Sequence, residues 1–168
     1  MPAVSLNTDQ ILSAGAQEAT GALQRLLQVS VRADAVLDLD DTQLIASHGP
    51  TAVVIVFQAT GGVSGTLAVV LDDDVALWLA SLMSASIAAE GTIGAGVLCM
   101  LAEFGNIVAS AFLNGAARIA GRTCLPSVPM VLHGATHQGV AAAVPPGTPL
   151  RVVKLRAQER CISVLFTG

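Results

Sequence analysis

The chain has 168 residues, of which 53% are hydrophobic and only 12% are charged, and its formal net charge is −4. This composition excludes a disordered protein, because a chain of this length and hydrophobicity buries a sizeable core. Its eight Lys and Arg residues are scattered, and it contains no Tyr. It therefore lacks the basic patch and the aromatic platform that bind nucleic acids. We predict a single domain over residues 1–168.

Membrane insertion is not expected from the pattern of apolar residues. The uncharged stretches on either side of Glu90, residues 75–89 and 91–102, are interrupted by serines or rich in glycine. Both fall short of the roughly 18 to 20 apolar residues that span a membrane. The N-terminal segment lacks the basic and apolar regions of a signal peptide. The sequence therefore predicts a soluble, cytoplasmic protein.

Neither a disulfide framework nor a metal site is indicated by the cysteines and histidines. The three cysteines form no CxxC pair, which suits buried thiols in a reducing compartment. His133 and His137 are four residues apart, but Gly134 and Gly139 make a metal-binding helix there improbable. The serines at 81, 84 and 86 have no nearby His and Asp that would suggest a catalytic triad. We expect no metal and no cofactor of the protein's own.

The first half of the chain predicts one helix followed by strands. Asn7 to Asp9 offer an N-cap, after which apolar residues recur at helical spacing. Alternating and β-branched residues then predict strands, two of which form a hairpin across Gly61 and Gly62. The predicted ranges are 11–29 for the helix and 31–39, 51–59 and 63–71 for the strands.

The second half predicts helices followed by strands. Asp72 to Asp74 lie at the start of a short helix, and Gly121 ends a long one. The predicted ranges are 75–86 and about 96–120 for the helices, and 130–133, 138–144, 150–156 and 161–166 for the strands. The order of helix and strands thus occurs twice, in halves of about 1–72 and 73–168. The two halves share too little sequence to prove a duplication.

A polar stripe in the long second-half helix is the strongest candidate for a site. At 100° per residue, its members fall within roughly a quarter of the helix circumference, opposite a face of large apolar residues. One member is Asn106, and Asn is a poor residue for a helix interior. Gly105, just before Asn106, lowers helix stability while allowing close approach of another backbone. Folding alone does not require this stripe. It consists of Cys99, Glu103, Asn106, Ser110 and Asn114.

The segment from Leu101 to Pro129 resembles the active helix of the CheC/CheX/FliY family of chemotaxis phosphatases. That family carries Asp or Ser, three residues, Glu, two residues, Asn, and then about 22 residues to Pro. Glu103, Asn106 and Pro129 match at these spacings, whereas Cys99 replaces the Asp or Ser. The resemblance implies an α+β fold whose pseudo-symmetric halves form a mostly antiparallel sheet packed against two long helices.

The resemblance also implies an activity, namely hydrolysis of the aspartyl phosphate of a CheY-like response regulator in chemotaxis or a related two-component pathway. The receiver domain of that regulator would supply Mg²⁺. Asn106 would orient the hydrolytic water, and Glu103 would pair with the receiver's active-site lysine. Gly105 and Ser110 would belong to the docking surface, with Cys99 and Pro129 as structural members of the motif.

Three questions stay open at the level of the sequence. In the first helix Gln10 and Ser13 take the places of the Glu and Asn, which predicts one competent site in place of the two that CheC proteins commonly carry. The alternative function is a non-catalytic binding module on the same fold, resembling the middle domain of flagellar switch proteins or an adaptor for a CheD-like partner. The resemblance fits either a monomer or a dimer.

Overall fold

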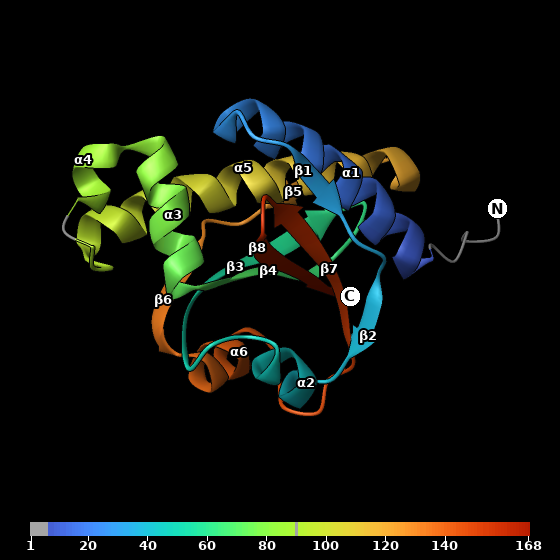
Figure 1. Ribbon diagram of the computed structural model, residues 1–168. Coiled ribbons are helices and arrows are strands. Elements are labelled where there is room, and N and C mark those ends of the chain that lie inside the picture. The colour runs from blue at the N-terminus through green and yellow to red at the C-terminus, as the bar shows by residue number, and fades with distance from the viewer. Residues whose placement is uncertain (1–6, 90) are drawn as a thin grey trace, which may run out of the picture.

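The computed structural model describes residues 7–89 and 91–168, the side chain of Ala88 excepted, and contains six helices and eight strands in that part of the chain (Figure 1). The helices are α1 (Thr8–Leu27), α2 (Asp41–Ala46), α3 (Asp73–Met83), α4 (Ala85–Ala88), α5 (Ala95–Ala120) and α6 (Thr136–Ala143). The strands are β1 (Val31–Ala33), β2 (Leu37–Leu39), β3 (Thr51–Gly61), β4 (Gly65–Asp72), β5 (Cys124–Pro126), β6 (Met130–Ala135), β7 (Leu150–Ala157) and β8 (Arg160–Thr167).

The strands form one antiparallel sheet between two layers of helices. Its order is β1-β7-β8-β4-β3-β5, with β2 also paired to β7 and β6 also paired to β3. The long helices α1 and α5 lie side by side over one face, and the short helices α2 and α6 cover the other (Figure 1). The predicted α+β fold, with an antiparallel sheet packed against two long helices, is confirmed.

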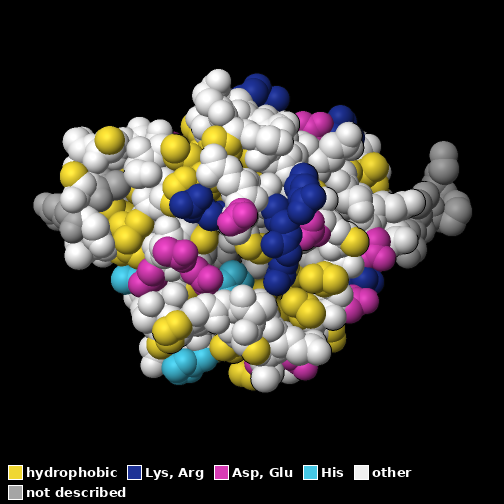
Figure 2. Space-filling model, viewed as in Figure 1, with side chains coloured by type: hydrophobic (Ala, Val, Ile, Leu, Met, Phe, Trp, Pro, Cys, Tyr) yellow, Lys and Arg dark blue, Asp and Glu magenta, His cyan; other side chains and the backbone are white. Residues whose placement is uncertain are grey.

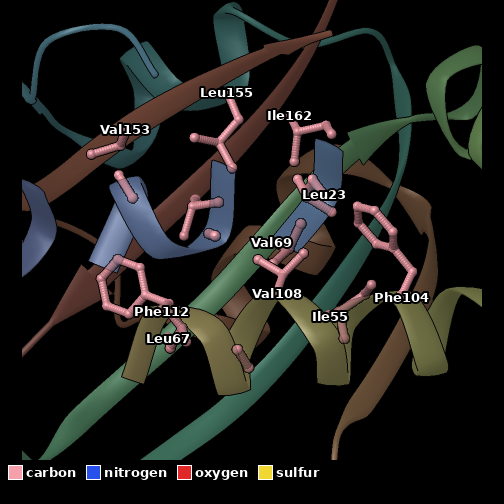
Figure 3. Packing of buried hydrophobic residues seen from close by; sticks show 14 of the residues in the cluster. Leu23, Ile55, Leu67, Val69, Phe104, Val108, Phe112, Val153, Leu155 and Ile162 are labelled. Atoms are coloured by element: carbon pink, nitrogen blue, oxygen red, sulfur yellow. The ribbon is translucent and has the colours of Figure 1, made fainter. Parts of the chain in front are cut away.

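Alternation along the strands divides the apolar residues between two cores. Ile55, Val69 and Val153 belong to the core on the side of α1 and α5, and Figure 3 shows Ile55 and Val69 near Val108 of α5. The intervening strand residues, such as Val54 and Val70, face α2 and α6. Because successive side chains point to opposite faces of a sheet, both faces are apolar, as a sheet covered on both sides requires.

The topology is an internal repeat. The order of helix, two short strands, short helix and two long strands runs from α1 to β4 and again from α5 to β8. The short strands of each half pair with the long strand of the other, β1 and β2 with β7, and β5 and β6 with β3. At the centre, Val69 pairs with Val164 where β4 meets β8. The twofold order of elements suspected from the sequence is therefore present in the fold.

Two predicted strands were wrong, and helix α2 and strand β5 were not predicted. The strand predicted over 31–39 is broken into β1 and β2, and the capping box of Asp40 and Gln43, which starts α2, was missed. The strand predicted over 138–144 is helix α6. Its Val140 is buried against the sheet, and a Cβ on Gly139 would lie only 2.7 Å from Val54 Cγ2. The lack of side-chain bulk at Gly139 therefore lets a helix, instead of a strand, lie directly on β3.

The prediction that no stretch is long and apolar enough to cross a membrane was wrong for α5. This 26-residue helix has a mean hydropathy of 1.7 in its most apolar window. By length and composition alone it is therefore long and apolar enough to cross a membrane. Half of that window is buried in the protein, and Phe104 and Phe112 are fully buried. Its apolar face is thus occupied by the sheet and α1, as in the core helix of a folded domain.

Candidate functional site

Helix α5 is held at its end and along one face. It ends at Gly121, whose φ of 66° is left-handed and whose N–H donates to the carbonyl of Ala117. Phe112 packs 6.2 Å, centroid to centroid, from Phe166 of β8, and Arg118 forms an ion pair with Glu18 of α1. The backbone that carries the polar stripe is therefore rigidly placed on the sheet.

The stripe occupies the outward face of α5, as the helical periodicity predicted. Cys99, Glu103, Ser110 and Asn114 are exposed, and Asn106 is half-buried. The side chains of Glu103 and Asn106 take part in none of the hydrogen bonds or ion pairs among residues 7–89 and 91–168. A carboxylate and a carboxamide thus stand about one helical turn apart on a free surface, available to an external partner.

Gly105 does not belong to this surface, which corrects the prediction that a partner approaches there. The residue is buried, and a Cβ at its position would lie 2.8 Å from Ile55 Cγ2 and 3.2 Å from Phe57 Cζ. The groups that approach Gly105 are the side chains of Ile55 and Phe57 on β3. The contribution of Gly105 to the site is indirect, because close contact with the sheet fixes the level of Glu103 and Asn106 above it.

Sheet register brings the segment around Pro129 to the same part of the molecule. Met130 at the start of β6 pairs with Val56 of β3, between the two residues that touch Gly105. Just before it, the Ser127 N–H donates to the Gln58 carbonyl at 2.8 Å, and the Gln58 N–H donates to Ser127 Oγ at 2.8 Å. Pro129 is half-buried and ends this anchored loop just before β6, consistent with a structural position.

The first helix offers a matching but chemically different face. In both α1 and α5, three residues separate the end of the helix from the short strand that follows. When the two helices are aligned at these ends, Gln10 corresponds to Glu103 and Ser13 corresponds to Asn106. Both α1 residues are exposed. Gln10 has a carboxamide where the motif requires a carboxylate, and Ser13 has a hydroxyl where the motif requires a carboxamide. The geometry therefore supports the sequence-based assignment of the two pairs of positions.

The residues described by the structure contain no group of three or more His, Cys, Asp or Glu side chains that could hold a metal ion. Sequence reasoning did miss a buried polar cluster around His48, on the face of the sheet opposite α5. The cluster consists of His48, Asp72 and Ser163, which are spread over more than a hundred residues of the sequence. No local sequence motif therefore indicates it.

The fold and the outward Glu-x-x-Asn stripe together define a class, an internally repeated antiparallel α+β protein with a candidate site on the second long helix. Residues 97–133, from the first turn of α5 into β6, match the CheC-like family model. This match covers Cys99, Glu103, Asn106 and Pro129. No curated protein sequence matches the chain.

Solved structures extend the likeness to the whole chain. FliY from Thermotoga maritima superposes with a TM-score of 0.73 at 17% identity, over 100% of this chain and 93% of that one. CheX in the CheX–CheY–BeF3–Mg²⁺ complex from Borrelia burgdorferi gives 0.66 at 17% identity, over 95% and 97% of the two chains. The FliM middle domain from Vibrio alginolyticus gives 0.63 at 10% identity, over 96% and 92%. The resemblance to CheC, CheX and FliY proteins is confirmed in fold and in the motif segment.

Proposed function

We propose that this protein is a phosphatase that hydrolyses the aspartyl phosphate of a CheY-like response regulator in a chemotaxis or related two-component pathway. The observation that carries the proposal is the pair Glu103 and Asn106, fixed on a rigid helix with their side chains directed outward and without partners among the described residues. We place this activity in the cytoplasm.

Asn106 is the group suited to the chemistry. Its amide combines a hydrogen-bond donor and an acceptor on one planar group, so it can orient a water in line with the phosphorus without acting as a base. An acyl phosphate is intrinsically labile, and Mg²⁺ held by the receiver would neutralise the charge that develops on the phosphoryl group. A hundredfold acceleration requires about 2.7 kcal/mol, which positioning alone can supply.

Glu103 is the group suited to docking. It lies on the same face as Asn106, and its carboxylate would form a charge-assisted bond to the receiver's active-site lysine. Such a bond fixes the register of the two proteins and thereby the position of the Asn106 amide over the phosphoryl group. Ser110, the next exposed residue along the stripe, would extend the docking surface. The existence of a CheX–CheY complex with this fold supports a receiver as the partner.

A non-catalytic binding module is the second candidate. The FliM middle domain has the same fold, and Cys99 stands where the family motif has Asp or Ser. A thiol is a weaker hydrogen-bonding group than a hydroxyl or a carboxylate. On this alternative the stripe would bind a receiver, a flagellar-switch component or a CheD-like protein without hydrolysing anything.

Phosphate release from phosphorylated receivers separates the two candidates. We expect the wild-type protein to accelerate release, and Asn106→Ala to lose at least about 90% of that acceleration, or 1.4 kcal/mol of barrier. Gln17→Ala is the matched control, because it removes an exposed carboxamide from α1, outside the stripe. No acceleration by the wild type across a panel of receivers would leave only the binding module. Equal acceleration by wild type and Asn106→Ala would remove Asn106 from the chemistry.

A further inference from the structure

A charged cavity lies where the end of α2, the start of α3 and the β7–β8 hairpin meet. Its volume is about 290 Å³, and its walls include His48, Asp74, Lys154, Glu159 and Arg160. Figure 2 shows acidic and basic side chains gathered next to one another across the middle of this face. The proposed phosphatase uses none of these residues.

One wall of the cavity is a rigid hydrogen-bonded chain. His48 has a side chain only 3% exposed; its Nδ1 lies 2.8 Å from Asp72 Oδ1 and its Nε2 lies 2.9 Å from Ser163 Oγ. The same Asp72 oxygen accepts the N–H of Gly49 at 3.0 Å. Both ring nitrogens and this carboxylate oxygen are thus committed within the protein, which holds the wall in one arrangement.

This chain has the order of an Asp–His–Ser triad but not the accessibility of one. Ser163 is completely buried and is not among the residues that line the cavity. A nucleophile has to reach the carbonyl carbon of its substrate, which a hydroxyl under His48 cannot do. The chain therefore shapes the cavity and does not make it a hydrolase site.

The other charges fall into those already paired and those without a partner. Arg156 is paired, because it donates to Asp34. Arg160 stacks 4.5 Å above the ring of Trp78 and donates to Gln158, but it takes part in none of the ion pairs among the described residues. Lys154, Asp74 and Glu159 take part in none of the ion pairs among the residues that the structure describes. Two cationic groups, Lys154 and Arg160, and two anionic groups, Asp74 and Glu159, are therefore available at the cavity to a ligand.

We propose that this cavity binds a small zwitterionic molecule of the amino-acid class. The ligand's carboxylate would bind Lys154, and its ammonium group would bind Asp74 and Glu159, while the fixed His48–Asp72 wall limits the space between them. A ligand with a single charge would leave one set of these groups without a counter-charge. The cavity lies at the lower limit of the roughly 300–1,000 Å³ typical of sites for drug-sized ligands, which favours a molecule as small as a free amino acid.

The test is an NMR titration of the full-length protein with matched small molecules. The probes are ω-amino acids of two to six carbons, with butyrate and butylamine as four-carbon analogues that each carry one charge. We expect one ω-amino acid to shift the backbone amide signals of residues 73–75 and 154–161, with a Kd at least about tenfold below those of both single-charge analogues. Lys154→Gln should weaken binding at least about fivefold.

Glu18→Gln is the control variant, because it removes a carboxylate from α1, which does not line the cavity. It should bind the ω-amino acid as the wild type does. Equal affinity for zwitterionic and single-charge probes would overturn the proposal. So would unchanged binding by Lys154→Gln, or the absence of shifts at residues 73–75 and 154–161. These outcomes do not depend on phosphatase activity, which the Asn106 variants test separately.

Discussion

At the scale of single residues, Glu103 and Asn106 differ in burial, and this difference indicates different roles. Asn106 is half-buried, whereas Glu103 is exposed. A side chain whose freedom is limited by packing is the better one for holding a water, since less entropy is lost when the reacting atoms are aligned. An exposed carboxylate is better suited to meeting a lysine on another protein.

The first prediction separates these roles by kinetics. Glu103→Gln keeps the size of the side chain but removes its charge, so we expect KM for the phosphorylated receiver to rise about 5- to 20-fold with kcat reduced less than about threefold. The effect should shrink with added salt, because salt screens the attraction that Glu103 provides. Steady-state hydrolysis at two ionic strengths measures this. A large fall in kcat with unchanged KM would instead make Glu103 part of the chemistry.

The second prediction concerns the three thiols. Cys99 is exposed, Cys161 is partly buried, and Cys124 is buried. Burial raises the pKa of the Cys161 thiol, an effect reduced by the nearby Lys154 and Arg156. Because the thiolate is the reactive form, alkylation by iodoacetamide in the native protein should proceed in the order Cys99, Cys161, Cys124. Mass spectrometry of peptides after timed labelling gives the order, and fastest labelling of Cys124 would contradict it.

The same raised pKa gives a pH dependence of stability with a definite sign. The folded-state pKa of Cys161 lies above its unfolded value, so the folded state favours the protonated thiol. This contribution to the free energy of unfolding is fully present below the unfolded pKa of about 8.5. It is lost as pH rises through the folded-state pKa. Cys161→Ala should therefore flatten part of the decline in stability on the alkaline side.

At the scale of elements, the crossing of α1 and α5 depends on glycine. A Cβ on Gly115 would lie 2.3 Å from the carbonyl oxygen of Ala14, and one on Gly15 would lie 2.5 Å from the ring of Phe112. Only hydrogen fits at Gly115, because the atom it faces is backbone and cannot rotate away. The two helices are therefore as close as their main chains allow, and α1 holds α5 in place on the sheet.

The third prediction uses two glycines with opposite expectations. Gly115→Ala should reduce the free energy of unfolding by about 1–3 kcal/mol, because the methyl group forces the helices apart. Gly21→Ala, in α1, should raise stability by up to about 1 kcal/mol, because its new Cβ would meet only the end of Arg25 at 3.4 Å and alanine favours the helix. Urea denaturation of both variants measures the difference. Stabilisation by Gly115→Ala would show that the helices do not approach so closely.

Elements with strong periodicity were predictable, and those decided by tertiary packing were not. The long helix was placed within one residue of α5, because Gly121 and a continuous apolar face mark it. Residues 138–144 look like a strand by their apolar run, yet Gly139 allows a helix to lie on β3. The exposure of the stripe followed from helical spacing, whereas the burial of Gly105 depends on Ile55 and Phe57, which are distant in sequence.

At the scale of the whole molecule, two similar halves carry different surfaces. The register of β4 on β8 places Ala68 opposite Leu165 and Val70 opposite Ser163, on either side of the central valine pair. The sheet is thus close to symmetric, while the outward faces of α1 and α5 carry different polar residues. On the proposed function, the second half supplies the active face and the first half mainly supplies the packing that supports it.

The last prediction tests whether the α1 face is equivalent to the α5 face. In an Asn106→Ala background, the pair Gln10→Glu and Ser13→Asn places the motif's carboxylate and amide on exposed positions of α1. If the halves are equivalent in backbone geometry, part of the lost phosphatase activity should return, to at least about twofold above the rate of the Asn106→Ala parent and below that of the wild type, because imperfect placement of the amide lowers the rate steeply. The control pair Gln17→Glu and Thr20→Asn, seven residues further along α1, should restore nothing. Equal recovery by both pairs would show that any Glu and Asn on this helix suffice. No recovery by the first pair would show that a receiver domain does not bind to the β1–β2 side of the fold as it binds to the β5–β6 side.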